Sequence, residues 1–252
     1  MTTIANDTAK LEPKNEKERL DVIAVGAHPD DVEIACGGTL AKLASQGYRV
    51  GIIDLTDGEP TPSSPGPEVR LAEAEAAGKA LGVAVRVNLN LPNRRLFDTF
   101  EHRVALAMQF RIWRPRLVLG FGAKTPMASP DHYQAMQITD AAIFYSRLTK
   151  WDEFFGGLPV HAISRHFYFR LAVESDYLPG ETCHVTVDIA STLEAKIASV
   201  LCYETQFASK PWIVERIKAA ATVSGYAAGV SAGEVFVAAR PFAVDDLLKT
   251  VM

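Results

Sequence analysis

The sequence predicts an α/β protein with a Rossmann-like, doubly wound, mostly parallel sheet and helices on both faces. Short apolar segments alternate with longer helical patterns along the first half of the chain. These short segments are apolar throughout rather than at every second residue, which is typical of strands buried on both faces. Right-handed crossovers between such strands give a doubly wound sheet, and the absence of a repeat or linker favours a single domain.

The elements are predicted from β-branched composition, helical patterns and the turn residues that bound them. Strands are expected at residues 21–26, 50–55, 83–89 and 116–120. Helices are expected at residues 38–46, 68–81 and 101–113, ending at Gly47, Gly82 and the Arg114-Pro115 pair. Beyond residue 150 the pattern is less clear: residues 161–173 and 184–190 resemble strands, 192–207 a helix, and the tail is mixed.

The composition favours a small-molecule partner in a reducing compartment. The chain has 252 residues, a net charge of -4 and 48% hydrophobic residues, so nothing indicates a polyanion-binding surface or a nucleic-acid partner. Cys36, Cys183 and Cys202 are too few and too widely spaced for a disulfide framework. Residues 1–18 are expected to form a flexible polar arm, without a signal peptide, before a domain at 19–252. No apolar run reaches the roughly 18 residues of a membrane span, so we expect a cytoplasmic protein.

Polar residues follow the predicted strands, where a doubly wound sheet places its ligand. His28, Asp30 and Asp31 come directly after the first strand, and His132 lies in the loop beyond the fourth. Two imidazoles and a carboxylate suit a catalytic zinc site with one position open for water. One carboxylate of the Asp30–Asp31 pair can bind the metal while the other acts as a base. The same run could also be a turn, in which Pro29 sets φ and an Asp caps the next helix.

A resemblance favours the metal site. Residues 26–47 resemble the signature of the PIG-L/LmbE deacetylase family, and especially its bacillithiol-pathway branch, whose members deacetylate an N-acetylglucosaminyl conjugate. The similarity covers most of residues 20 to 237. It continues through residues 54–59, 68–74, 88–95, 130–132, 187–190, 203–207 and 229–236.

The resemblance implies a role for particular residues. It implies one Zn²⁺ per chain bound by His28, Asp31 and His132, although iron or manganese could use the same ligands. Asp30 would be the general base, and Arg70 would hold sugar hydroxyls. The implied reaction is hydrolysis of an N-acetyl group from an N-acetylglucosamine-type small molecule or conjugate, which releases acetate and a free amine. Relatives form trimers or hexamers, so a homo-oligomer is expected.

The chain departs from the family pattern at two positions. Ser129 stands where the family usually has a histidine that stabilises the oxyanion and can act as an acid, and a serine cannot supply a proton near neutral pH. His161 and His166 are candidates to replace it. Asn93 stands where relatives often carry Asp, and remains a candidate for substrate contact.

Asp131, next to a proposed ligand, is expected to orient a neighbouring side chain or to contact substrate. Two alternative functions stay open. One is a metal-dependent amidase of thiol–sugar conjugates, and the other is a sugar-binding protein that lost catalysis, which Ser129 would explain.

Overall fold

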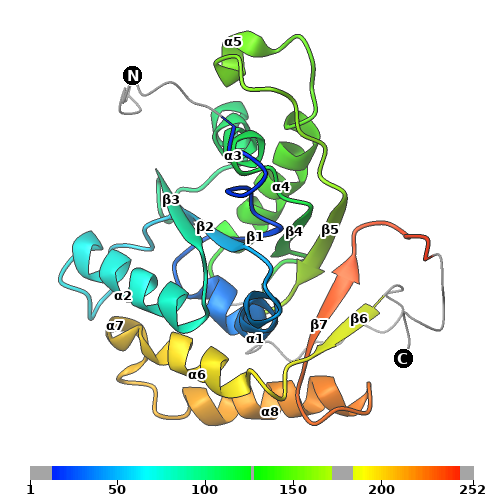
Figure 1. The fold of residues 1–252 in the computed structure, drawn as a ribbon. Helices are drawn as coiled ribbons and strands as arrows, with labels where there is room; N and C mark the ends of the chain where they lie inside the picture. Colours follow the sequence, from blue (N-terminus) through cyan, green and yellow to red (C-terminus); the bar gives the residue numbers. More distant parts are fainter. Residues whose placement is uncertain (1–12, 126–127, 172–183, 245–252) are drawn as a thin grey trace.

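A seven-stranded sheet forms the centre of the molecule (Figure 1). The structure is a computed structural model that describes residues 13–125, 128–171 and 184–244. The strand order is β3-β2-β1-β4-β5-β7-β6, and β7 runs in the direction opposite to the other six strands. The strands are β1 (Val22–Gly26), β2 (Val50–Thr56), β3 (Val85–Leu91), β4 (Leu117–Phe121), β5 (Arg165–Phe169), β6 (His184–Asp188) and β7 (Gly233–Ala238).

The direction of winding reverses between β1 and β4. From β1 the chain moves outward through β2 to β3, and from β4 it moves the other way to β5. The two strands are paired directly, with Ala24 beside Leu119. Loops that leave the carboxyl ends of such a strand pair diverge to opposite faces and leave a crevice between them. Residues that follow β1 and β4 therefore meet at this point.

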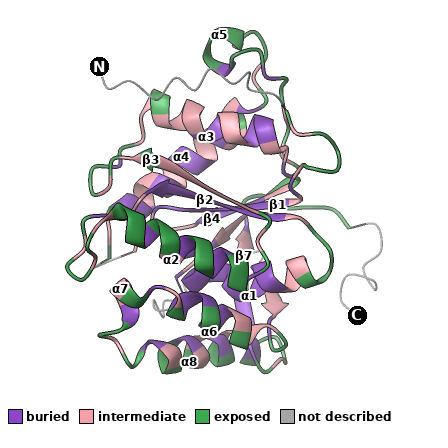
Figure 2. Ribbon diagram, turned by 60° about the vertical axis from the view of Figure 1, so that its left-hand side comes forward, coloured by how far each residue is buried: buried purple, intermediate pink, exposed green. Residues whose placement is uncertain are grey.

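Helices cover both faces of the sheet, and the expected doubly wound architecture is confirmed (Figure 2). α3 and α4 lie on one face, α1 and α2 on the other, and α6 and α8 lie beneath α1 and α2. Within the described ranges, no helix combines the length and apolar character of a membrane span. The helices are α1 (Asp31–Ser45), α2 (Pro67–Ala80), α3 (Phe100–Trp113), α4 (Asp131–Tyr145), α5 (Asp152–Phe155), α6 (Leu193–Leu201), α7 (Glu204–Phe207) and α8 (Ile213–Tyr226).

Most elements of the first half lie where the sequence predicts them, with one difference. Helix α1 begins at Asp31 rather than at Gly38, because the backbone is helical on both sides of a break at Cys36 (φ -143°, ψ 20°). The prediction placed the start at residue 38 because the glycine pair Gly37-Gly38 follows this break. Helices α4, α5 and α8 and strand β7 are additional to the predicted elements.

Part of the expected N-terminal arm lies outside the described residues. Residues 1–12 are not described, whereas the backbone N–H of Lys14 donates to Ile112 O at 2.8 Å. The N–H of Leu20 donates to Trp113 O at 2.9 Å, so residues 14–20 run beside the end of α3. Cys36 and Cys202 are free thiols, and Cys183 lies outside the described residues.

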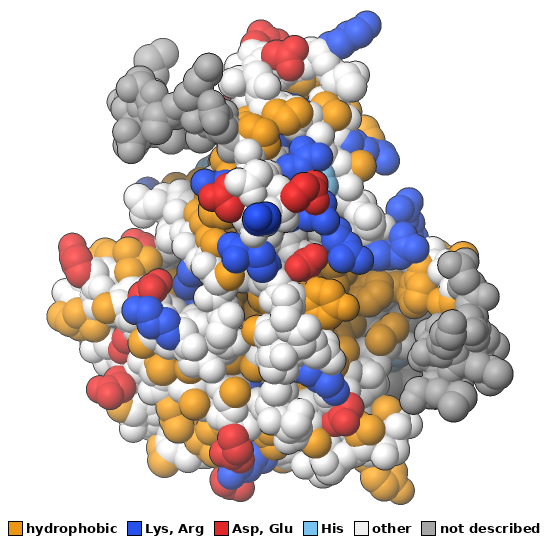
Figure 3. Space-filling view, viewed as in Figure 1, with side chains coloured by type: hydrophobic (Ala, Val, Ile, Leu, Met, Phe, Trp, Pro, Cys, Tyr) orange, Lys and Arg blue, Asp and Glu red, His pale blue; other side chains and the backbone are white. Residues whose placement is uncertain are grey.

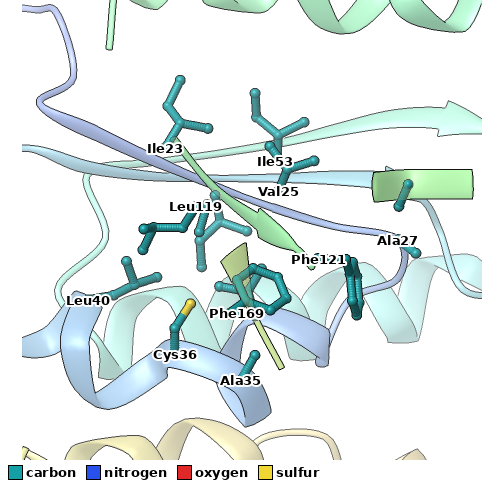
Figure 4. Packing of buried hydrophobic residues seen from close by; sticks show 14 of the residues in the cluster. Ile23, Val25, Ala27, Ala35, Cys36, Leu40, Ile53, Leu119, Phe121 and Phe169 are labelled. Carbon is teal, nitrogen blue, oxygen red and sulfur yellow. The ribbon is translucent and has the colours of Figure 1, made fainter. Parts of the chain in front are cut away.

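The apolar core fills both sides of the sheet (Figure 4). Ile23 and Ile53 project to the face covered by α3 and α4, and Leu119 and Phe121 project toward α1. Cys36 is fully buried among them, and burial raises the pKa of its thiol well above the usual value. The thiol therefore acts as a small apolar side chain rather than as a nucleophile.

A buried ion pair stabilises the break in α1. Just after the break, the N–H groups of Gly38 and Thr39 donate to the Glu234 carboxylate of β7, at 3.0 and 2.7 Å. Lys196 Nζ of α6 donates to the same carboxylate at 2.6 Å. Close packing requires the glycine, since a Cβ at Gly38 would lie 2.8 Å from Ile189. Glu234 thus joins α1, α6 and the distal sheet.

Replacement of Glu234 by alanine should lower the free energy of unfolding by about 3–5 kcal/mol, because it leaves a buried ammonium and two backbone donors without an acceptor. Urea unfolding measures this change. The matched control is E75Q, which removes an exposed pair with Lys79 and should cost less than about 1 kcal/mol. Equal losses in the two variants would contradict this role of Glu234.

Candidate metal centre

Three side chains from the two sides of the crevice converge on one point. His28 follows β1, Asp31 is the first residue of α1, and His132 lies in the first turn of α4. One ligand atom from each lies within 4.8 Å of the other two. Across residues 13–125, 128–171 and 184–244, this is the one such group of three potential metal ligands. The expected convergence of His132 on the turn at residues 28–31 is therefore found.

The backbone holds Asp31 in a fixed orientation. Its Oδ2 accepts hydrogen bonds from the N–H groups of Ala27 (3.0 Å) and His28 (2.8 Å). Its Oδ1 lies 3.3 Å from His132 Nε2. One oxygen is thereby tied to the turn after β1 while the other faces the second histidine. A carboxylate held in this way can bind a cation without losing its position.

Neighbouring side chains fix both imidazole rings. The Thr125 hydroxyl lies 2.8 Å from His132 Nδ1, and the ring stacks on Phe121 with centroids 4.7 Å apart and planes 12° apart. Asp131 Oδ2 lies 3.4 Å from His28 Nε2 and accepts a hydrogen bond from Arg94 N at 2.6 Å. Such partners set the tautomer and the direction of a metal-binding histidine.

Asp30 occupies a strained position beside this group. Its φ is 110°, a left-handed conformation that Asp and Asn tolerate better than most residues. Its Oδ2 lies 3.0 Å from Arg70 Nη2, which also donates to Pro29 O. Arg70 is 2% exposed, and its Nε and Nη1 have no hydrogen-bond partner in the structure. The strained turn and the arginine together direct the Asp30 carboxylate.

Burial and mutual charge shift the pKa values of these groups in different directions. Burial raises the pKa of Asp30 to about 6, although Arg70 opposes the shift. Burial disfavours the charged form of Asp31 too, but His132 and His28 outweigh it and hold the pKa of Asp31 below its usual range. For His28, burial lowers the pKa, but the Asp31 carboxylate and a hydrogen bond to Asp131 raise it to about 10. The carboxylates around His28 thus favour a positive charge at this point, which in the absence of a metal ion is the proton on the imidazole.

The donor set and the local charge fit a dication. Two imidazoles and one carboxylate are the ligands of catalytic zinc sites, which keep a position open. Five carboxylates lie in the surrounding region, and the arginines paired with them are Arg70 and Arg86. Asp31, Glu33, Asp54 and Asp131 are buried, and the Asp30 side chain is 16% exposed. A bound dication would offset much of this excess of negative charge.

The candidate substrate residues lie around the same crevice. Asn93 Nδ2 donates to Glu59 O at 2.8 Å, and its Oδ1 is buried without a partner. Ser129 Oγ accepts from Asp131 N at 3.3 Å, in the turn that precedes α4. Asp131 is 2% exposed and contacts His28, which favours an orienting role over substrate contact.

Neither candidate histidine joins the metal ligands. His161 Nε2 bonds to Pro115 O at 2.7 Å, at the end of the sheet where β4 begins. His166 Nδ1 lies 3.5 Å from Asp140 Oδ1, and Asp140 is about 12 Å further along α4 than His132. Burial lowers the pKa of His166 to about 4, so this imidazole is neutral at physiological pH. Neither His161 nor His166 therefore takes the role of the family histidine that Ser129 replaces.

Two contributors to the site carry no clear signal in the sequence. Thr125 orients His132 from within the same loop, and a hydroxyl seven residues before a proposed ligand is too common to indicate this. Arg86 lies in β3 and neutralises Asp54 and Glu33. An arginine inside an otherwise apolar strand is the one feature that could have indicated a buried carboxylate partner.

Comparisons with known proteins agree with the fold. The family model described as PIG-L: GlcNAc-PI de-N-acetylase matches residues 23–143. The conserved protein TT1542 from Thermus thermophilus is 32% identical, with 90% of this chain and 98% of that chain covered and a TM-score of 0.77. Diacetylchitobiose deacetylase of Thermococcus kodakarensis is 29% identical over 80% of this chain and 74% of its own length. The 1D-myo-inositol 2-acetamido-2-deoxy-alpha-D-glucopyranoside deacetylase of Saccharomonospora viridis is 26% identical over 87% and 95%.

The fold and the converging side chains define one class, the doubly wound α/β proteins with a candidate metal site of two histidines and one aspartate at the switch between β1 and β4. Within that class, the chain belongs to the PIG-L family. The family resemblance seen in the sequence is thereby confirmed.

Metal binding at this centre should release a proton. The pKa of His28 is raised to about 10, so the imidazole is protonated at neutral pH and a cation must displace that proton. Zn²⁺ affinity should therefore rise about tenfold per pH unit between pH 6 and 8. Calorimetry in two buffers of different ionisation enthalpy would count the protons released.

The matched variants are H132A, which should lose most of the Zn²⁺ affinity, and H161A, which should bind as the unmodified protein does. Affinity that does not change with pH, or that survives in H132A, would mean that the cation binds elsewhere.

Proposed function

We propose that this protein is a zinc-dependent hydrolase that removes the acetyl group from an N-acetylglucosamine-type small molecule or conjugate. The products are acetate and a free amine. The observation that carries this proposal is the convergence of His28, Asp31 and His132 beside the half-buried carboxylate of Asp30. Relatives named as deacetylases of diacetylchitobiose and of an inositol-linked acetamido sugar support the substrate class.

Asp30 acts as the general base in this proposal. When bound, zinc supplies Lewis acidity that makes a water molecule more acidic and polarises the acetamide carbonyl. Asp30 takes the proton of that water as the oxygen attacks the carbonyl carbon. Arg70, 3.0 Å from Asp30 Oδ2, keeps the carboxylate directed at the site. Asp131 and Thr125 keep the two imidazoles in their binding orientation.

The same carboxylate is the best source of the proton for the leaving amine. The C–N bond breaks as the amine nitrogen takes a proton, and Asp30 holds one after the first step. Its raised pKa, about 6, suits a group that accepts and then donates near neutral pH. Ser129 accepts a hydrogen bond from Asp131 N in its turn, and a hydroxyl cannot replace an imidazole as an acid. Asp30 therefore serves as base and then as acid.

Arg70 and Asn93 are the proposed contacts for sugar hydroxyls. Arg70 Nε and Nη1 donate to no protein acceptor, and Asn93 Oδ1 accepts from no protein donor. Hydroxyl groups both donate and accept, so a sugar would satisfy both kinds of atom. Figure 3 shows Lys and Arg side chains across the middle of one face, with acidic groups interspersed. A mixed surface of this kind suits a polar small molecule rather than a polyanion.

We also propose that the protein works in the cytoplasm as a homo-oligomer, either a trimer or a hexamer, with its catalytic domain at 19–252. Free thiols at Cys36 and Cys202 support a reducing compartment.

A substrate panel tests the proposed reaction. Zinc-loaded protein should release amine from N-acetylglucosamine or diacetylchitobiose, and a chelator should abolish the release. Cleavage of a thiol–sugar conjugate amide, without deacetylation, would favour the amidase instead. No amine from any acetylated amino sugar, despite bound zinc, would favour a sugar-binding protein without catalysis, for which Ser129 is the motivating residue.

D30N should lower kcat by about 10²–10⁴-fold while zinc stays bound, because the change removes the base but keeps a side chain that tolerates positive φ. Activity of the unmodified enzyme should fall as the pH drops through about 6, since the protonated carboxyl cannot accept a proton.

Steady-state kinetics from pH 5 to 8 measure both effects. The matched control is D140N, at an aspartate paired with Tyr168 further along α4, which should retain activity. Near-normal turnover by D30N would show that another group is the base.

A further inference from the structure

A buried tyrosine lies against the arginine that holds Asp30. Tyr203, between α6 and α7, is fully buried, and the Arg70 guanidinium carbon lies 5.1 Å from its ring centroid. Its hydroxyl donates to Glu33 Oε1 at 2.9 Å. Burial and the nearby Glu33 raise the pKa of Tyr203 well above its usual value, so the hydroxyl keeps the proton that it donates. The ring is thus fixed at its far end.

The acceptor of this hydrogen bond is itself fixed. Glu33 Oε1 also accepts from Arg86 Nη1 at 2.5 Å. Arg86 donates two further hydrogen bonds to the Asp54 carboxylate, at 2.7 and 2.9 Å, and one to Ala74 O at 2.9 Å. A paired charge in this geometry allows little movement. The hydroxyl of Tyr203 is therefore attached to the sheet through β3 and β2.

Hydrogen bonds alone do not fix the plane of the Arg70 guanidinium. Only Nη2 has polar partners, Pro29 O and Asp30, while Nε and Nη1 have none. A guanidinium held at one nitrogen can rotate and draw its carboxylate partner with it. The ring of Tyr203, 5.1 Å from the guanidinium carbon, is a contact that can limit this rotation.

The segment that carries Tyr203 is tied to the helix that carries Arg70. Thr205 donates to the Glu73 carboxylate of α2 through its N–H (2.8 Å) and its hydroxyl (2.6 Å). Arg70 lies one turn earlier on the same helix. The hydrogen bonds between Thr205 and Glu73 thus fix the separation between the Tyr203 ring and the Arg70 guanidinium.

We propose that Tyr203 is a positioning residue that holds the Arg70 guanidinium, and through it the Asp30 carboxylate, in the orientation that the reaction needs. This inference rests on the proposed function. The ring limits the guanidinium, and the hydroxyl fixes the ring to Glu33. Tyr203 itself does not touch the reacting atoms.

A double-mutant cycle with Arg70 tests the inference. Y203F keeps the ring and should lower kcat/KM by about 3–10-fold, whereas Y203L removes the ring and should lower it by about 30–100-fold. In an R70K background, Y203L should cause less than about a 3-fold further loss, because the group that it positions is gone. Zinc content should stay unchanged in all variants. Y145F is the matched control, since Tyr145 lies beside Arg103 in a similar pair and should leave kcat/KM unchanged.

Two outcomes would overturn the inference: a Y203L enzyme with lower thermal stability but unchanged kcat/KM, or the same fold-loss in the R70K background as in the unmodified one. If the unmodified enzyme deacetylates nothing, the proposed function fails, and a crystal structure of Y203L still decides the positioning role. Loss of the contact between Arg70 and Asp30 there would support the role, and an unmoved guanidinium would refute it.

Discussion

The carboxylate of Asp31 is the constraint on which the arrangement of the site depends. One of its oxygens is bonded to the backbone that leaves β1, and the other faces a histidine on α4. The crevice between β1 and β4 exists because of the winding order of the sheet, but a crevice alone would not bring the ligands together. Asp31 links the two diverging chain segments, because its negative charge belongs to the segment after β1 and faces the imidazole of His132 on α4.

That link has an electrostatic consequence for the surrounding residues. Ionised carboxylates gathered away from water destabilise one another, and only two arginines neutralise them. Arg86 neutralises Asp54 and Glu33. Arg70 faces Asp30 and leaves the pKa of that carboxyl raised. The carboxylates paired with Arg86 thus have a structural role, whereas Asp30, paired with Arg70, can exchange a proton.

Much of this could be predicted from the sequence. Buried parallel strands have a distinct apolar pattern, so β1, β2 and β4 and the doubly wound class were accessible. The candidate ligands were accessible because His28 and Asp31 lie within one turn and because strand ends of such a sheet meet. The start of α1 was not, since the break at Cys36 depends on an acceptor, Glu234, almost 200 positions away. Arg86 and Tyr203 were missed for the same reason, because their partners come from distant segments.

The break in α1 has a consequence for how the chain is divided. All three candidate metal ligands lie within residues 23–143, the part that the family model matches. Yet the N–H groups of Gly38 and Thr39, just after the break, donate to Glu234 of β7, and Glu33 receives a hydrogen bond from Tyr203. A fragment that stopped at residue 143 would keep the three candidate ligands but expose the underside of α1 to solvent. The last third of the protein therefore shields α1 from water, although it contributes none of the candidate metal ligands.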